Sequence, residues 1–154
     1  MSHIRTQIRN AVVAKLRADG GFGLVEPGLR ILRGIQEDQY PIAFVSVSDA
    51  GMPVGKNPPG SRPLQRALRV DVVIGSVNDD VDLDEDLDTL AGKIEVSLSD
   101  PKVLGFGSVL DWSYVGTEPP SASKAEEFGF AAAKVTFRGT VTTQEGQPST
   151  NIHP

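Results

Sequence analysis

Seven carboxylates lie within one ten-residue stretch in the middle of the chain. Their type and close spacing make them candidates for binding a metal ion or for catalysis. They are Asp79, Asp80, Asp82, Asp84, Glu85, Asp86 and Asp88. Carboxylate oxygens are preferred ligands of Ca²⁺ and Mg²⁺, and a bound metal ion can activate water for hydrolysis. The cluster therefore raises two hypotheses, a divalent-cation site and a metal-dependent hydrolase.

The spacing of these acids does not fit a calcium-binding loop. A loop that begins at Asp80 needs glycine where Glu85 stands and glutamate where Ala91 stands. Acids in a first helical turn instead accept hydrogen bonds from free N–H groups and complement the positive end of the helix dipole. We interpret the cluster as a helix start, with a contact to another subunit as the second interpretation. We expect no cofactor, and at most a loosely bound divalent cation.

The other motifs that could bind or catalyse are incomplete. Residues 50–57 resemble a phosphate-binding loop, but Asn57 occupies the position where such a loop needs a serine or threonine hydroxyl to bind magnesium. The sequence has no cysteine, and its two histidines are His3 and His153. A histidine base inside the fold and a thiolate nucleophile are therefore not expected. These observations predict a protein that is not an enzyme.

The charge of the chain is unevenly distributed. The chain has 154 residues and a net charge of −5. Up to Arg69 it contains ten Lys and Arg residues and five Asp and Glu residues. After Arg69 it contains five Lys and Arg residues and fifteen Asp and Glu residues. The basic residues are scattered without interleaved aromatics, so we expect no specific nucleic-acid binding. No segment approaches the ~18 apolar residues of a membrane span, so no membrane association is expected. The asymmetry favours head-to-tail packing of identical copies.

Hydrophobic periodicity predicts two helices and a set of strands. The predicted helices span residues 2–20 and 83–98, and the predicted strands span residues 29–35, 40–48, 66–77, 108–117 and 134–142. A long Gly- and Pro-rich loop is predicted over residues 49–63. This order predicts an α+β fold, in which two helices pack on a mainly antiparallel sheet. We expect a single domain over residues 1–143 and a flexible C-terminal tail over residues 144–154.

The order of these elements, together with several short strings, resembles phage tail terminators. The strings are the helix Ile4–Leu16, YPIAFVSV at 40–47, the strand Leu68–Val77, an acidic-start helix that ends in Ser99-Asp100-Pro101, and VTF at 135–137. More specifically, residues 3–143 are similar to the minor tail protein U type of lambda-like phages. The resemblance rests on element order and hydrophobic strings, without an invariant signature.

The resemblance implies a small virion protein, assembled in the host cytoplasm, that carries out no catalysis. Such a protein forms a hexameric ring, caps the tail tube, stops its polymerisation and presents a surface to the head–tail connector. Its partners are then identical copies, the tube protein and the connector. The alternatives are a head–tail joining or tail-completion protein, and a carboxylate-metal hydrolase that uses Asp79–Asp88. Exposed charge and loops, not the resemblance, suggest the contact residues Lys56, Arg62, Arg66, Asp79, Asp80, Asp82, Asp84 and Asp86.

Overall fold

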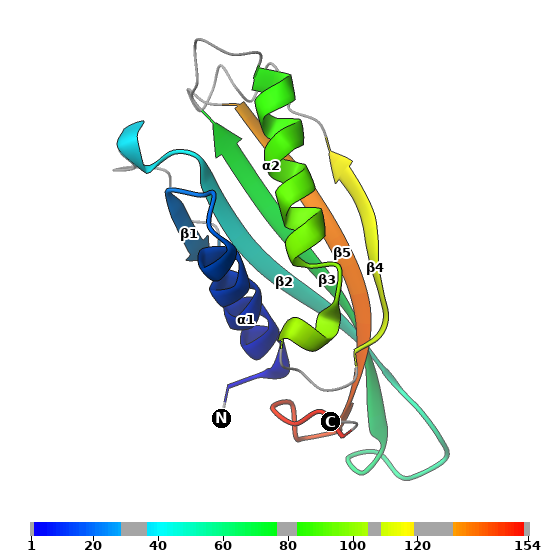
Figure 1. Cartoon of the computed structure of the whole chain (residues 1–154). Helices are drawn as coiled ribbons and strands as arrows, with labels where there is room; N and C mark the ends of the chain where they lie inside the picture. The colour runs from blue at the N-terminus through cyan, green and yellow to red at the C-terminus, as the bar shows by residue number, and fades with distance from the viewer. Residues whose placement is uncertain (1, 29–36, 77–82, 105–108, 119–130, 153–154) are drawn as a thin grey trace.

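The computed structural model describes residues 2–28, 37–76, 83–104, 109–118 and 131–152. Within them, two helices and five strands form one α+β unit with strand order β1-β2-β3-β5-β4 (Figure 1). The elements are α1 (Ile4–Asp19), β1 (Leu24–Pro27), β2 (Ile42–Pro53), β3 (Pro63–Ser76), α2 (Leu83–Ser97), β4 (Leu110–Glu118) and β5 (Ala131–Gln144), with short 3-10 helices at Glu37–Gln39 and Pro101–Leu104. β1 pairs with β2 in parallel, and the other described pairings are antiparallel. The predicted fold class is confirmed.

Both helices pack on the same face of the sheet (Figure 1). α1 lies over β1 and β2, and α2 lies over β3 and β5. The side chains that they bury recur at three- and four-residue steps, as the sequence predicts: Ile4, Ile8, Val12 and Leu16 in α1, and Leu87, Leu90, Ala91, Ile94 and Leu98 at α2 and just after it. The matching face of β3 carries Leu68, Val70, Val72 and Ile74, all almost fully buried. These apolar faces form one continuous core.

The ends of α1 follow from its local sequence. His3 caps the first turn, because its Nδ1 accepts a hydrogen bond from the Arg5 N–H at 3.1 Å. Gly20 follows the helix with φ of 73°, a conformation that glycine adopts without steric cost, and its N–H donates to the Leu16 carbonyl at 3.2 Å. The predicted end of this helix at the glycine pair is confirmed.

The hairpin between β2 and β3 is longer than the sequence predicts. β2 continues to Pro53 and β3 begins at Pro63, so the loop predicted over residues 49–63 is a connection of residues 54–62 only. Asp49, Ala50 and Gly51 have the composition of a turn. They nevertheless pair with β3 in register, with Asp49 opposite Leu68. The prediction was wrong here because cross-strand pairing outweighs the local preference of these residues.

The first strand was not predicted. β1 contains only four residues, just after a glycine-rich segment, so it has no readable alternation. It forms because its backbone pairs with the start of β2, from Leu24 opposite Ile42 to Pro27 opposite Val45. The strand predicted at residues 29–35 lies outside the described residues.

The segment after β5 is attached to the domain. The sequence predicts a flexible tail from residue 144, but residue 144 is the last residue of β5. Beyond it, the Ile152 N–H donates to the Thr142 carbonyl at 2.9 Å, and the Ile4 N–H donates to the Pro148 carbonyl at 2.7 Å. Residues 145–152 therefore fold back onto β5 and the first turn of α1.

An aromatic cluster attaches β4 to α2. Trp112 stacks on Phe137 of β5 with ring centroids 5.4 Å apart, and its Nε1 donates to the Leu98 carbonyl at 2.6 Å. Tyr114 meets the edge of the Phe137 ring but remains 44% exposed. The register of β4 shifts twice, and Asp111 within it has a φ of 54°.

Among the described residues, no helix combines the length and apolarity that crossing a membrane would need.

Candidate interaction surfaces

The acidic cluster is only partly within the described residues. Asp79, Asp80 and Asp82 lie outside them, as does the side chain of Asp84 in the first turn of α2. The hypothesis that these acids cap the helix therefore stays a prediction. In the part of the chain that the structure describes, no three His, Cys, Asp or Glu side chains are grouped so that they could hold a metal ion.

Asp86 has a role within the fold. Its carboxylate accepts a hydrogen bond from the buried Ser76 hydroxyl at 2.5 Å. Because Ser76 ends β3 and Asp86 lies in the first turns of α2, this bond fixes the start of the helix to the end of the strand. Glu85 and Asp88 beside it are exposed.

The end of the β2–β3 hairpin extends beyond the body of the sheet (Figure 1). We call residues 50–61 the arm. Every residue of the arm is exposed, and Met52 is 61% and Val54 44% exposed. Lys56, one of the predicted contact residues, lies in the arm. Met52 and Val54 are the large apolar side chains that the arm exposes.

Glu145 holds the base of the arm. Its carboxylate accepts a hydrogen bond from the Gly60 N–H at 2.5 Å and forms an ion pair with the Arg62 guanidinium at 2.9 Å. The hydrogen bond from Arg62 is the main reason that the pKa of Glu145 lies below its ordinary value. Within the arm, the Ser61 hydroxyl donates to the Pro58 carbonyl at 3.0 Å. These contacts fix the base of the arm, at residues 58–62, although the whole arm is exposed.

Arg66, another predicted contact residue, lies inside the protein. Its guanidinium is 2.6 Å from the Asp49 carboxylate, and both side chains are only 11% exposed. Its Nε also donates to the Thr143 hydroxyl at 2.9 Å, and Arg5 approaches the same Asp49 carboxylate at 3.7 Å. The charge of Arg66 is used to neutralise Asp49 at the core. A sequence pattern cannot show such a pairing, because the partners are 17 and 77 residues away.

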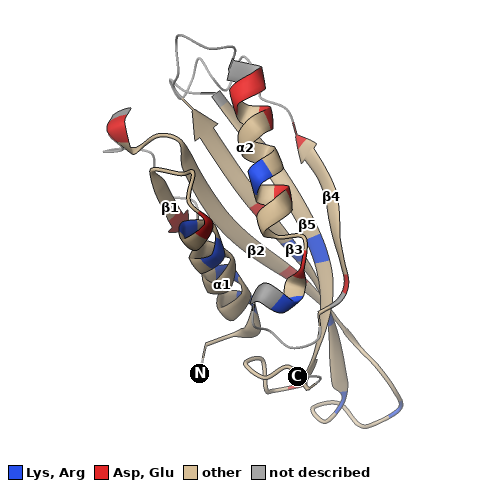
Figure 2. Ribbon diagram, in the orientation of Figure 1, with Lys and Arg blue, Asp and Glu red and all other residues tan. Residues whose placement is uncertain are grey.

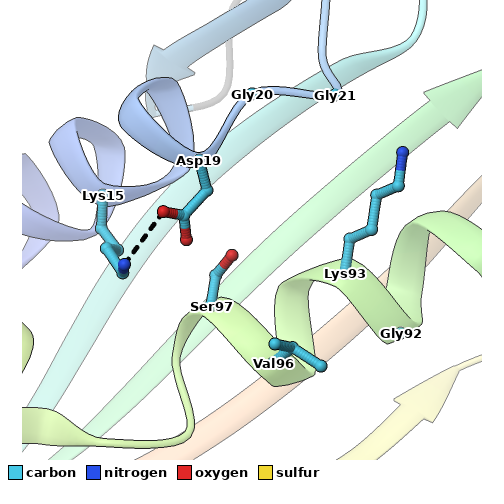
Figure 3. Close-up of a pocket in the computed structure, with 8 residues that line it drawn as sticks. All are labelled: Lys15, Asp19, Gly20, Gly21, Gly92, Lys93, Val96 and Ser97. Carbon is cyan, nitrogen blue, oxygen red and sulfur yellow. Dashed lines mark hydrogen bonds and ion pairs between the residues drawn. The ribbon is translucent and has the colours of Figure 1, made fainter.

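A groove of about 710 Å³ separates α1 from α2 near the C-terminal end of α1 (Figure 3). Glycines at 20, 21 and 92 leave it unfilled, and Val96 on its rim is 77% exposed. Lys15 and Asp19 in its wall form an ion pair at 2.9 Å. A hydrogen bond from Ser97, and secondarily one from Lys15, lowers the pKa of Asp19. The sequence analysis missed this groove, since its glycines come from separate segments.

The described residues thus include two exposed features beside the predicted contact residues: the arm, with Met52 and Val54, and the groove between α1 and α2. The sequence matches no family model, and no curated protein matches it. Any functional interpretation therefore rests on these surfaces and on the order of the elements.

Proposed function

We propose that this chain is a phage tail terminator, a structural subunit that forms a hexameric ring at the end of the tail tube. The ring ends polymerisation of the tube and then provides the surface to which the head's connector attaches. The observation that carries the proposal is the arm, an exposed and apolar element that projects from one end of a compact body (Figure 1).

The construction of the arm suits a contact with a preformed surface. Binding usually orders flexible loops, at a cost of about 0.5–1.5 kcal/mol for each side chain immobilised. The hydrogen bonds that Gly60 and Arg62 donate to the Glu145 carboxylate fix the base of the arm before any partner binds. Its apolar side chains Met52 and Val54 are then available to be buried. We therefore assign the arm to the contact with the tube end.

The order of the elements supports the same proposal. In the described residues a helix, a short strand, a hairpin, a second helix and two strands follow one another, and this order includes the helix, hairpin, helix and final strand on which the resemblance to tail terminators rests. A head–tail joining protein is the nearest alternative, because it too would need a projecting contact element. The two differ in the partner that the arm binds.

Oligomeric state is the first test. Analytical ultracentrifugation and electron microscopy of the purified chain, with and without Mg²⁺, are expected to show closed rings. A protein that stays monomeric at every concentration and holds one metal ion tightly would refute the proposal and favour the hydrolase.

The second test concerns the arm. The double variant Met52→Ser, Val54→Ser should form rings but no longer bind the ends of cognate tail tubes. The matched control is Val96→Ser, which removes an exposed valine from α2, outside the arm, and should bind normally. Rings that bind purified connector but not tube ends would identify a joining protein instead.

A further inference from the structure

One lateral side of the molecule is basic. α1 covers the β1 side of the sheet and carries Arg5 and Arg9, which are neighbours one helical turn apart, and Arg17, which lies about two turns further along. Arg17 donates to the Val25 carbonyl of β1 from two nitrogens, at 2.7 and 3.0 Å, so this flank faces the β1 edge. The Arg5 and Arg17 side chains are 50% and 55% exposed, and each also forms a long ion pair within the chain, Arg5 with Asp49 at 3.7 Å and Arg17 with Glu26 at 3.9 Å.

Arg9 is the least satisfied member of this flank. Its guanidinium makes one long hydrogen bond, to Asn10 Oδ1 at 3.4 Å, and its Nε is buried without a hydrogen-bond partner. Within the described residues, no ion pair includes Arg9. A buried donor of a charged group that lacks its partner costs free energy. The buried Nε is closed to a partner from outside the chain, so an external carboxylate can bind only the terminal nitrogens of this guanidinium, one of which makes the long bond to Asn10.

The opposite lateral side is acidic. Asp88 and Glu95 are seven residues apart and therefore share one flank of α2. Lys93 lies on the other flank, in the groove that faces α1 (Figure 3), so the acidic flank faces away from α1. In the described part of the chain, neither Asp88 nor Glu95 forms an ion pair. β4 is the sheet edge on this side and carries the half-exposed Tyr114.

We infer that the Arg5–Arg9–Arg17 flank of one copy packs against the Asp88–Glu95 flank of the next copy. Figure 2 shows the basic residues along α1 and the acidic residues along α2. Because the two flanks are different surfaces on opposite sides, each copy uses both, and such heterologous contacts propagate around a ring. The inference rests on the proposed ring and specifies which surfaces close it.

The contact offers partners to the Arg9 guanidinium and to the Asp88 and Glu95 carboxylates, which form no ion pair within the described residues. Arg9 meets a carboxylate, and the exposed ring of Tyr114 offers its face to an arginine. Arginine and tyrosine are also enriched among the residues that contribute most to binding at protein interfaces. Since the surfaces are exposed and charged, the contact should weaken as salt is added.

Two charge-reversed variants test the contact. The first, Arg5→Glu with Arg9→Glu, has two acidic sides, and the second, Asp88→Lys with Glu95→Lys, has two basic sides. Each alone should raise the dissociation constant of the assembly by about tenfold or more, because like charges then meet at every contact. An equimolar mixture should assemble again, since acidic and basic sides alternate around a ring with an even number of subunits.

The matched control is Lys93→Glu, which reverses an exposed charge on the inner flank of α2 and should leave assembly unchanged. Circular dichroism and thermal melting establish that each variant is folded. If the unmodified chain assembles and both double variants assemble equally well, the inferred contact is wrong and the ring proposal stands. If the unmodified chain never assembles, the proposed function itself fails.

Discussion

Gly139 of β5 is expected to be replaceable by a larger residue only at a cost in stability. A Cβ atom at this position would lie 2.6 Å from Val109 Cγ1 and 2.9 Å from Trp112 Cε3. Both distances are shorter than any ordinary carbon–carbon contact, so Gly139→Ala must displace both the Val109 side chain and the indole. The indole cannot move freely, because it stacks on Phe137 and its Nε1 is bonded to the Leu98 carbonyl.

The size of the effect follows from these contacts. Forcing one extra carbon into a packed site costs about 1–3 kcal/mol, and losing the Trp112–Leu98 hydrogen bond costs about 0.5–1.5 kcal/mol more. Alanine restricts the unfolded chain relative to glycine and returns about 0.4–1 kcal/mol. We therefore expect Gly139→Ala to lower the free energy of unfolding by about 1–3.5 kcal/mol.

Urea unfolding measures this change, and the only tryptophan of the chain, Trp112, reports it by fluorescence. The matched control is Gly116→Ala in β4, where a Cβ would meet no heavy atom within 4 Å. The control should leave stability unchanged or slightly higher. Equal stability of the two variants would refute the packing argument, as would an unshifted tryptophan emission spectrum in folded Gly139→Ala.

Two further predictions concern ion pairs. Arg66→Ala should lower the free energy of unfolding by about 3 kcal/mol, because it leaves the Asp49 carboxylate without its partner in a site that is only 11% exposed. The control Arg69→Ala removes an exposed arginine and should change the free energy of unfolding by less than about 1 kcal/mol. Urea titration of both variants measures the difference. Arg62 holds the pKa of Glu145 in the folded state below its value in the unfolded state. The stabilisation from Glu145 is therefore complete at a pH above the unfolded-state pKa, and it is lost as the pH falls through the folded-state pKa. Glu145→Gln should therefore flatten the acid limb of stability against pH, and an unchanged limb would contradict the assignment.

The sequence predicted the parts of the fold that depend on local periodicity. Leu68, Val70, Val72 and Ile74 alternate strictly, and all four face the core. The helix from Leu83 onward was found for the same reason, since its apolar residues recur on one side. In both cases the pattern exists because one face of the element is buried and the other is not.

The parts that the sequence could not predict depend on partners that are distant along the chain. Arg62 and Arg66 look like free surface cations, but Glu145 and Asp49 neutralise them. Lys56, by contrast, is exposed in the arm, as a loop position leads one to expect. Charge and loop composition indicate which residues can make contacts; they do not indicate which of them are already occupied within the fold.

The two edges of the sheet have a consequence for how copies of this chain can associate. β1 is four residues long and ends in Pro27, and β4 is interrupted by two register shifts. Short, proline-ended and irregular edge strands resist the open-ended strand pairing that leads to aggregation. Such edges benefit a protein that reaches a high local concentration while it assembles. Copies then associate through side-chain surfaces, which can form a closed particle, and not through backbone pairing between strands, which can continue without limit.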